Sequence, residues 1–418
     1  MTADPLNPFA RGVIADPYPL YHQLRAEDPV HWVAPWGPWF LTRYADVAAA
    51  QRDPRLIKRN FRTASLDKLP PEAQKDLEPW LRILTVDLAY ADPPANTQLR
   101  APVGRALSAR GVEALRPRVQ AIVDELIDAV ADAGRMDVID DFAYPLPTLV
   151  GAALLGVPHE DLGHVRRWSE ELTAVFLGDP DDVALRSRAK LATLALVGYF
   201  RDLLRARRVV PRDDLMSELI GSEVGADSLS EDNLTALCMQ LLFSGRGGTP
   251  LFFGNGLLAL LQHPDQLELL RGDPSLLPTA VEELLRYDAA PQSIARVAAE
   301  DLEIDGRRIG KGQLVLLSLA AANRDPAEFP GPDRLDLTRR RNRHVTFGYA
   351  SHFCVGASLV RIEAQVAFGT LVRRLPGLRL ATGSPAWREN VQERMLRSLP
   401  VTFTPTGTTR SAQIASAG

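Results

Sequence analysis

The longest apolar pattern with helical spacing in this 418-residue chain runs from about residue 230 to residue 262, and it is interrupted in its middle. Its start at residues 228–231 reads Ser-Leu-Ser-Glu, which is typical of a capping box. Residues 244–250 then place three glycines and a proline inside the helix. Each Gly costs about 1 kcal/mol and Pro about 3 kcal/mol relative to Ala. The pattern predicts a break, which fits either an ordinary loop or a helix opened by a large bound group.

The rest of the chain is also mainly helical by its spacing, with residues 112–133 and 264–271 as examples. A second capping box at residues 279–282 leads into a short helix. No linker, charge block or repeat divides the chain. We predict a mainly α protein with small β-sheets: one domain over residues 16–405, between flexible ends at 1–15 and 406–418. Short strands are expected at 30–33 and 39–42, around a Gly37-Pro38 turn, and at 302–305, 313–319 and 401–403.

Composition excludes several classes of protein. With 48 basic and 52 acidic side chains the net charge is -4, which argues against a nucleic-acid or membrane-surface partner. The sequence has no secretory signal and no run of 18 apolar residues, so we expect a cytoplasmic protein without a membrane span. Two cysteines, Cys238 and Cys354, exclude a disulfide framework and a Cys-rich zinc site. Cys238 lies in an apolar helical run and is interpreted as core packing.

Cys354 lies in a loop of glycines and aromatic residues at 347–356, just before a segment whose composition favours a helix. The free N–H groups and the dipole of a helix N-terminus favour a thiolate there. A thiolate can act as a nucleophile, with His352 as a base in poor geometry, or as a metal ligand. A lone thiolate cannot build a four-ligand zinc site, but it can be the one protein ligand of haem iron.

The stretch from Phe347 to Gly356 resembles the haem-binding loop of the cytochrome P450 superfamily, Phe-Gly-x-Gly-x-His-x-Cys-x-Gly. Glu283 and Arg286 resemble the Glu-x-x-Arg pair of that family, which helps to lock the core behind the haem. The resemblance covers residues 16 to 403. It implies the cytochrome P450 fold, a triangular prism-like arrangement with haem b (iron protoporphyrin IX) between a distal and a proximal helix.

The same resemblance assigns roles around the cofactor. Cys354 is implied as the iron ligand, Phe347 as the cover of the proximal haem face, and Gly348 and Gly356 as points of close backbone approach. Buried haem propionates need cationic partners. The implied partners are Arg100, Arg296 and His352, with Asn96 as a weaker neutral donor where many members have His. Without the motif, Arg100 and Arg296 would be interpreted as surface cations.

Two further departures from the family pattern concern backbone strain and mechanism. Ala350 replaces the usual Gly, and a positive φ there would cost about 1–2 kcal/mol. On the distal helix, Gly247 and Gly248 occupy the positions of the acid and the alcohol that guide protons during oxygen activation. Thr249 is the nearest hydroxyl, about 100° further around the helix.

Three explanations of the missing acid and alcohol remain open. A polar group of the substrate, with ordered water, can replace them in a monooxygenase. Alternatively the enzyme uses peroxide or performs coupling, desaturation or rearrangement, with Arg246 as an acid or anchor; or oxygenase chemistry is lost. A different class of function is a helper protein that activates a glycosyltransferase. Such helpers typically lose the haem cysteine, whereas this chain keeps Cys354.

Substrate and partners follow from the resemblance alone. A small-molecule, secondary-metabolite-like substrate would contact Phe243, Ser244, Gln292, Ile294 and Leu396, for each of which ordinary core packing is the alternative. A ferredoxin and a ferredoxin reductase would supply electrons. The basic run at residues 339–344 is expected to receive the ferredoxin, or to be simply a solvated charged loop.

Overall fold

The chain forms two compact units in the computed structural model. The first unit consists of Met1–Leu56, Glu113–Pro147 and Gly248–Gly418. The second unit consists of Ile57–Val112 and Thr148–Gly247. The predicted flexible ends lie partly outside the described residues. No described helix combines the length and apolarity that a membrane span requires. The structure describes residues 6–10, 12–34, 37–58, 70–72, 74–75, 78, 88, 92–93, 95–177, 182–221, 230–245, 247–381, 385–388, 390 and 392–406.

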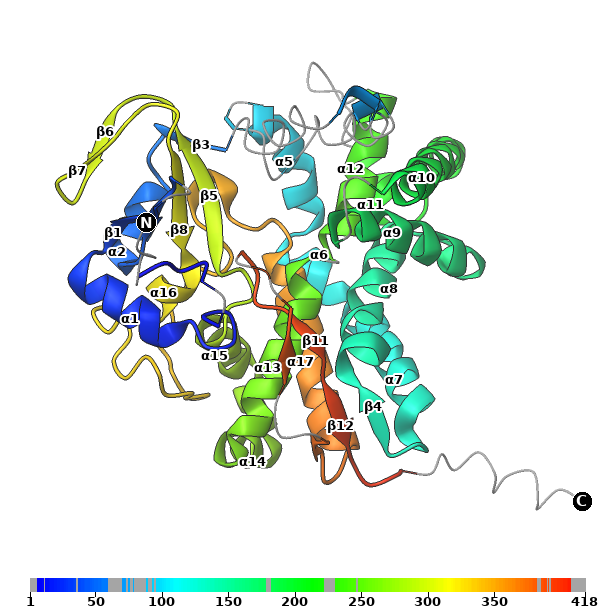
Figure 1. Cartoon of the computed structure of the whole chain (residues 1–418). Coiled ribbons are helices and arrows are strands. Elements are labelled where there is room, and N and C mark those ends of the chain that lie inside the picture. Colours follow the sequence, from blue (N-terminus) through cyan, green and yellow to red (C-terminus); the bar gives the residue numbers. More distant parts are fainter. Residues whose placement is uncertain are drawn as a thin grey trace, which may run out of the picture. The chain divides into compact units, whose positions relative to one another are not determined.

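A five-stranded sheet organises the first unit, with strand order β1-β2-β8-β5-β3 (Figure 1). The predicted hairpin is confirmed: β1 and β2 pair antiparallel, and Gly37 in the turn has φ +79°. β8 then joins β2 in parallel, with Leu316 opposite Phe40, and β5 joins β8 antiparallel, with Arg296 opposite Val315. The strands span Val30–Trp32 (β1), Trp39–Leu41 (β2), Leu314–Ser318 (β8), Ser293–Ala298 (β5) and Leu56–Ile57 (β3).

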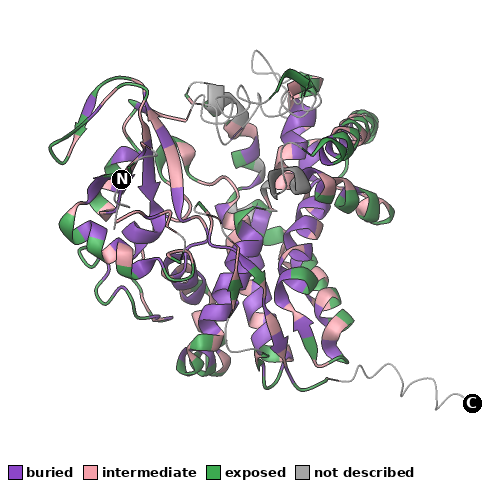
Figure 2. Cartoon of the chain, in the orientation of Figure 1, coloured by how far each residue is buried: buried purple, intermediate pink, exposed green. Residues whose placement is uncertain are grey.

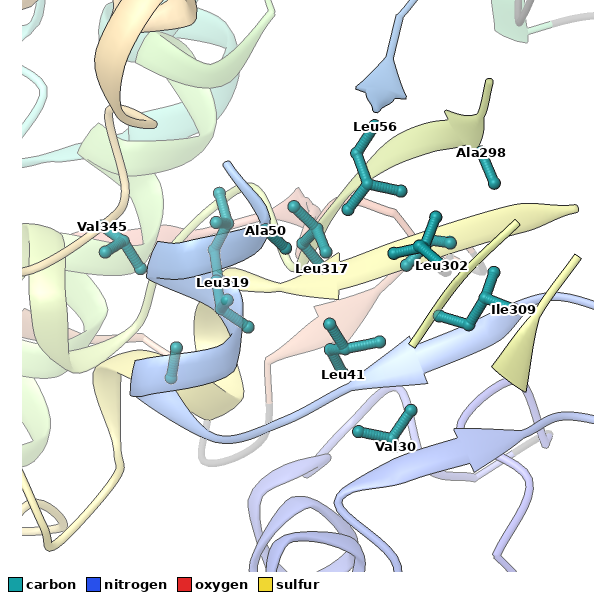
Figure 3. Packing of buried hydrophobic residues seen from close by; sticks show 13 residues of the cluster. Val30, Leu41, Ala50, Leu56, Ala298, Leu302, Ile309, Leu317, Leu319 and Val345 are labelled. Carbon is teal, nitrogen blue, oxygen red and sulfur yellow. The ribbon is translucent and has the colours of Figure 1, made fainter. Parts of the chain in front are cut away.

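Both faces of this sheet are buried, because alternate residues of each strand face opposite sides. Val315 and Leu317 of β8 belong to a core cluster beneath α2 (Tyr44–Ala50) and the hairpin of β6 (Leu302–Ile304) and β7 (Arg307–Ile309) (Figure 3). Leu316, between them, belongs to a second cluster with residues of α1 (Tyr18–Glu27) and α16 (Leu319–Asn323). The predicted strands at 302–305 and 313–319 are therefore confirmed.

The remaining helices of the first unit pack around α17 (Ala357–Arg374). α7 (Arg116–Ala131) presents Val119, Val123 and Ile127, each no more than 1% exposed, at the four-residue spacing of one helix face. The other helical elements are Val138–Ala143 (η1), Gly248–Gln262 (α13), Pro264–Gly272 (α14), Pro274–Leu276 (η3), Leu277–Tyr287 (α15) and Ala350–His352 (η4); the other strands are Arg135–Asp137 (β4), Arg379–Leu380 (β9), Ala386–Trp387 (β10), Leu396–Ser398 (β11) and Pro400–Thr402 (β12).

The second unit is helical in its described part. Its long helix α10 packs on α9 and α12, and a buried ion pair between Arg207 and Asp214 closes its C-terminal end at 2.5 Å. Arg207 also donates to the Gly156 carbonyl at 2.6 Å. The helices are Ala95–Ala106 (α5), His159–Asp161 (η2), Leu162–Leu177 (α9), Val183–Val209 (α10), Leu215–Gly221 (α11) and Glu231–Ser244 (α12), while Ala109–Ala114 (α6) and Pro145–Leu154 (α8) continue across unit boundaries.

The predicted helix break is confirmed, since α12 ends at Ser244 and α13 begins at Gly248. The predicted caps need correction. Ser230 is the N-cap of α12 and accepts from the Asn233 N–H at 3.2 Å, while Ser228 lies outside the described residues. Thr279 lies inside α15, and its hydroxyl donates to the Leu276 carbonyl at 2.9 Å. That leaves Glu282 available for a tertiary contact.

Candidate active site

Cys354 lies in a loop that closes on itself just before α17. The Cys354 N–H donates to the Phe347 carbonyl at 2.7 Å, and the Ala357 N–H donates back to the Cys354 carbonyl at 3.3 Å. The thiol is half-buried and forms no disulfide. With Gly356 as N-cap, the loop delivers the sulfur to the N-terminal end of an 18-residue helix. Such a helix end favours a thiolate over a thiol.

Two residues of the loop have left-handed backbone. Gly348 has φ +73°, and a Cβ there would come within 3.1 Å of the His352 carbonyl oxygen. Ala350 has φ +53°. It stands where the family pattern has glycine, and a positive φ at this position was considered from the sequence. The methyl group therefore stores about 1–2 kcal/mol of strain in the loop. Gly356 has ordinary backbone, and a Cβ on it would lie 4.0 Å from the Cys354 sulfur.

The cations predicted for the cofactor are held in different ways. Arg296 on β5 is 1% exposed and donates through Nη1 to the Ala295 carbonyl at 2.8 Å. His352 is half-buried in the short turn η4, two residues before Cys354. Arg100 is half-buried on α5 of the second unit, and Asn96 lies in the first turn of that helix, with its side chain outside the description.

A group of four side chains borders the Cys354 loop on the α15 side. The Arg361 guanidinium of α17 lies 4.8 Å from the Phe347 ring centre and donates twice to the Glu282 carboxylate, at 2.6 and 2.8 Å. His344 also contacts Glu282, at 3.2 Å, and its ring centre lies 5.7 Å from that of Phe347. Burial alone would raise the pKa of Glu282, but hydrogen bonds from Arg361 and His344 lower that pKa to about 2.

The Glu283–Arg286 pair is confirmed as a buried ion pair, with both side chains fully buried and N–O distances of 2.8 Å. Arg286 also donates to the carbonyls of Asn323 and Pro332. Arg339, predicted within the basic docking run, instead turns inward. It donates to Glu283 at 3.0 Å and is only 10% exposed.

At the break between α12 and α13, Gly247 and Gly248 are exposed, and a Cβ added at either meets no atom of the described residues within 4 Å. Neither has positive φ, so the backbone does not require glycine. Two other glycines, Gly254 and Gly256 on α13, have no room for a side chain. A Cβ at Gly254 would lie 2.6 Å from Ile139, and one at Gly256 would lie 2.8 Å from Phe368. Thr249 is buried in the first turn of α13, and Arg246 lies outside the described residues.

The residues predicted to contact substrate are mostly engaged elsewhere. Gln292 is 4% exposed, accepts from the Tyr21 hydroxyl at 3.1 Å and donates to the Ala289 carbonyl at 2.7 Å. Leu396 is 1% exposed, and Ile294 packs against the sheet core. These contacts show how the three side chains pack, and their contact with substrate stays a prediction. Phe243 is half-buried near the end of α12, and the Ser244 side chain is not described.

Sequence reasoning missed two features of this region. Glu282 and Arg361 lie 79 positions apart, so neither spacing nor composition predicts their pairing. Glu363, on α17, is 3% exposed, and burial raises its pKa to about 8. Its Oε2 has no hydrogen-bond partner among the described residues. An acidic residue inside an otherwise apolar helix face was the available signal. The described residues contain no group of three or more His, Cys, Asp or Glu placed to hold a metal ion.

Comparison with known proteins identifies the family. The cytochrome P450 family model matches residues 196–377. The chain is 42% identical to a vitamin D(3) 25-hydroxylase of Pseudonocardia autotrophica, over 93% of this chain and 94% of that protein. It belongs to the cytochrome P450 superfamily. It is also 39% identical to the 6-deoxyerythronolide B hydroxylase of Saccharopolyspora erythraea, over 92% and 96% of the two chains. The solved structure of CalO2 superposes with a TM-score of 0.87 at 34% identity, covering 97% of this chain and all of that one.

Cytochrome P450 proteins bind haem b, and this is the cofactor of the chain. The residues present fit that group. A thiol at a helix N-terminus suits a ligand of haem iron, and the glycine at position 356 places no side chain of its own next to the sulfur. A buried arginine such as Arg296 is suited to a carboxylate that is withdrawn from water. The mostly helical fold with small sheets is that of the cytochrome P450 structures.

Proposed function

We propose that the chain is a haem-thiolate monooxygenase of a small, secondary-metabolite-like molecule that carries its own polar group to the reacting centre. Cys354 would hold the haem iron, and Arg100, Arg296, His352 and Asn96 would pair with the propionates. When bound, the haem supplies the oxygen-activating chemistry. The observation that carries the assignment is the Cys354 loop, with its N–H bonded to the Phe347 carbonyl and its thiol at the start of α17.

The substrate's role in proton delivery is argued from the two glycines of the helix break. Gly247 and Gly248 stand where the family has an acid and an alcohol, and their Cβ positions are open. Neither residue can hold a proton, since glycine has no side chain. The open positions leave room for a hydroxyl of the substrate or for water, while Thr249 is the nearest protein hydroxyl along the chain. The names of the vitamin D(3) 25-hydroxylase and the 6-deoxyerythronolide B hydroxylase support hydroxylation as the reaction.

The test compares substrate pairs that differ by one hydroxyl, with product formed per reducing equivalent as the readout. The wild type is expected to couple well only with the hydroxylated member of a pair. The double variant Gly247→Asp/Gly248→Thr adds Cβ atoms at positions that no described atom occupies, and it is expected to improve coupling on the member without the hydroxyl. Equal coupling of both members by the wild type would contradict the proposal. Efficient turnover with peroxide alone, without reducing partners, would favour the peroxide alternative instead.

We propose a ferredoxin, reduced by a ferredoxin reductase, as the electron donor. Arg340, Arg341 and Arg343 are exposed just before the Cys354 loop, and Phe353 within the loop is 42% exposed. Cations around an exposed aromatic residue suit an acidic partner. Arg339 is excluded from this surface because it is bonded to Glu283.

The variant Arg340→Glu/Arg343→Glu is expected to slow reduction by an acidic ferredoxin at least tenfold at low salt. Reduction by dithionite should not change. The control variant Arg308→Glu reverses an 82% exposed charge on β7 and should leave the ferredoxin rate unaltered. Equal rates for all three proteins would remove this surface as the docking site.

A further inference from the structure

We propose that Arg361 and Glu282 are positioning residues for Cys354, and that their opposite charges jointly set how easily the haem-thiolate centre accepts an electron. The inference rests on the proposed role of Cys354 as the axial ligand. It goes beyond that role because it assigns the adjustment of the centre to a specific ion pair on α15 and α17. Neither residue is part of the predicted set of cofactor contacts.

The geometry connects the pair to the sulfur-bearing loop through Phe347. The Phe347 carbonyl accepts the Cys354 N–H at 2.7 Å, which couples the backbone of the two residues. The centre of the Phe347 ring lies 4.8 Å from the Arg361 guanidinium and 5.7 Å from the centre of the His344 ring. Both of these neighbours contact the same carboxylate, Glu282. The ring and the loop are thereby held against one charged cluster.

The charges of Arg361 and Glu282 are fixed at neutral pH. Hydrogen bonding to Glu282 raises the pKa of Arg361, burial opposes this, and the charges of Glu282 and Cys354 raise it further. The guanidinium is therefore electrostatically coupled to the thiol as well as to the carboxylate. The pair is only partly shielded from water, at 31% and 26% exposure. A partly buried charge keeps much of its effect on a neighbouring group, because solvent screening is reduced there.

The two charges should act on reduction in opposite directions. Reduction adds negative charge to the centre, which a nearby cation stabilises and a nearby anion opposes. Removing the Arg361 charge should therefore lower the reduction potential. Removing the Glu282 charge leaves the guanidinium uncompensated and should raise the potential. A purely structural ion pair predicts no such opposition, because either substitution breaks the same contacts.

The experiment measures the reduction potential of the haem-loaded protein by dye-equilibrated titration, for Arg361→Gln and Glu282→Gln at constant pH without a redox partner. We expect shifts of opposite sign, each about threefold or more in the equilibrium constant for one-electron reduction, or about 30 mV at 59 mV per tenfold change. Arg361→Lys keeps the charge, so its reduction potential should shift by less than half as much as that of Arg361→Gln. Asp301→Asn and Arg308→Gln break an exposed ion pair at 2.8 Å elsewhere in the unit and should not shift the potential.

The reduced, CO-bound spectrum of each protein separates the possible failures. If the wild type lacks the red-shifted thiolate band, the proposed function fails. If the wild type has that band but both variants shift in the same direction, or neither shifts, the positioning role is overturned. A variant that loses its haem is replaced by Arg361→Met or Glu282→Leu, and the same two signs are required.

Discussion

The two thiols of the chain have different surroundings. Cys238 is fully buried in α12, and burial raises its pKa to about 12, so it stays protonated at neutral pH. Cys354 is half-buried at the N-terminal end of α17, beside an arginine that is coupled to it electrostatically. Only the second environment favours a thiolate. This residue-level contrast separates a packing cysteine from a ligand.

Glu363 gives the stability of the protein a pH dependence of its own. Burial raises its pKa to about 8, from about 4.5 in the unfolded chain. The folded state therefore prefers the protonated carboxyl. The contribution of protonated Glu363 to the free energy of unfolding is fully present below about pH 4.5 and is lost as the pH rises through 8.

We predict that Glu363→Gln, which mimics the protonated carboxyl, is only slightly more stable than the wild type at pH 5 and much more stable at pH 8. The gain at pH 7 should approach roughly 3 kcal/mol. Urea midpoints measured between pH 5 and 8 test this. Glu125→Gln, an exposed carboxylate on α7, is the control and should run parallel to the wild type. If Glu363→Gln also runs parallel, Glu363 is not the buried acid described here.

At the scale of elements, the glycines in and next to α13 fall into two sets that differ in the space around them. Gly254 and Gly256 face Ile139 and Phe368 at distances that leave no room for a methyl group. Gly248 starts the helix and Gly247 lies just before it, and a Cβ added at either meets no described atom within 4 Å. The first two allow close packing of α13 against its neighbours (Figure 2). Packing does not require glycine at Gly247 and Gly248, so we attribute the absence of side chains there to the proposed role of the substrate in proton delivery.

Alanine substitution should separate these roles. Gly254→Ala is expected to destabilise the protein by about 1–3 kcal/mol, because the new methyl group overlaps Ile139. Gly248→Ala should be neutral or stabilising by about 0.5 kcal/mol, because it reduces the flexibility of the unfolded chain at no steric cost. Thermal or denaturant unfolding provides the measurement. Similar destabilisation by both substitutions would contradict the open space at Gly248.

The break between α12 and α13 could be predicted from the sequence, because Gly and Pro act locally on helix stability. The hairpin around Gly37 and the helix after Cys354 could be predicted for the same reason. The capping box at Thr279 was wrong, since the first turn of α15 starts two residues earlier and Glu282 has tertiary partners. Such partners come from distant segments, and no local pattern encodes them.

At the scale of the whole molecule, Glu283 joins segments that are far apart in sequence. Its carboxylate accepts from Arg286, Arg339 and Asn342, and from the Asp336 N–H. Arg286 in turn holds the Asn323 and Pro332 carbonyls. This network fixes the segment that leads into the Cys354 loop. A buried charge left without its partner is costly, because little water reaches it.

We predict that Glu283→Gln and Arg286→Met each cost about 3–5 kcal/mol of unfolding free energy and lower haem content. The double variant should cost clearly less than the sum, since the loss of the contacts between Glu283 and Arg286 is counted in both single variants and only Arg339 then lacks its carboxylate. Urea denaturation of the four proteins completes the cycle. Additive losses would mean that the two residues act independently.

The reduced, CO-bound absorption spectrum tests the central claim most directly, because its band position reports the axial ligand. The wild type and Cys238→Ala are predicted to give the red-shifted band of thiolate ligation. Cys354→Ser is predicted to lose that band while keeping the fold, as judged by circular dichroism. A well-folded wild type without the band, or a Cys354→Ser protein that retains it, would contradict the assignment of Cys354 as the haem ligand.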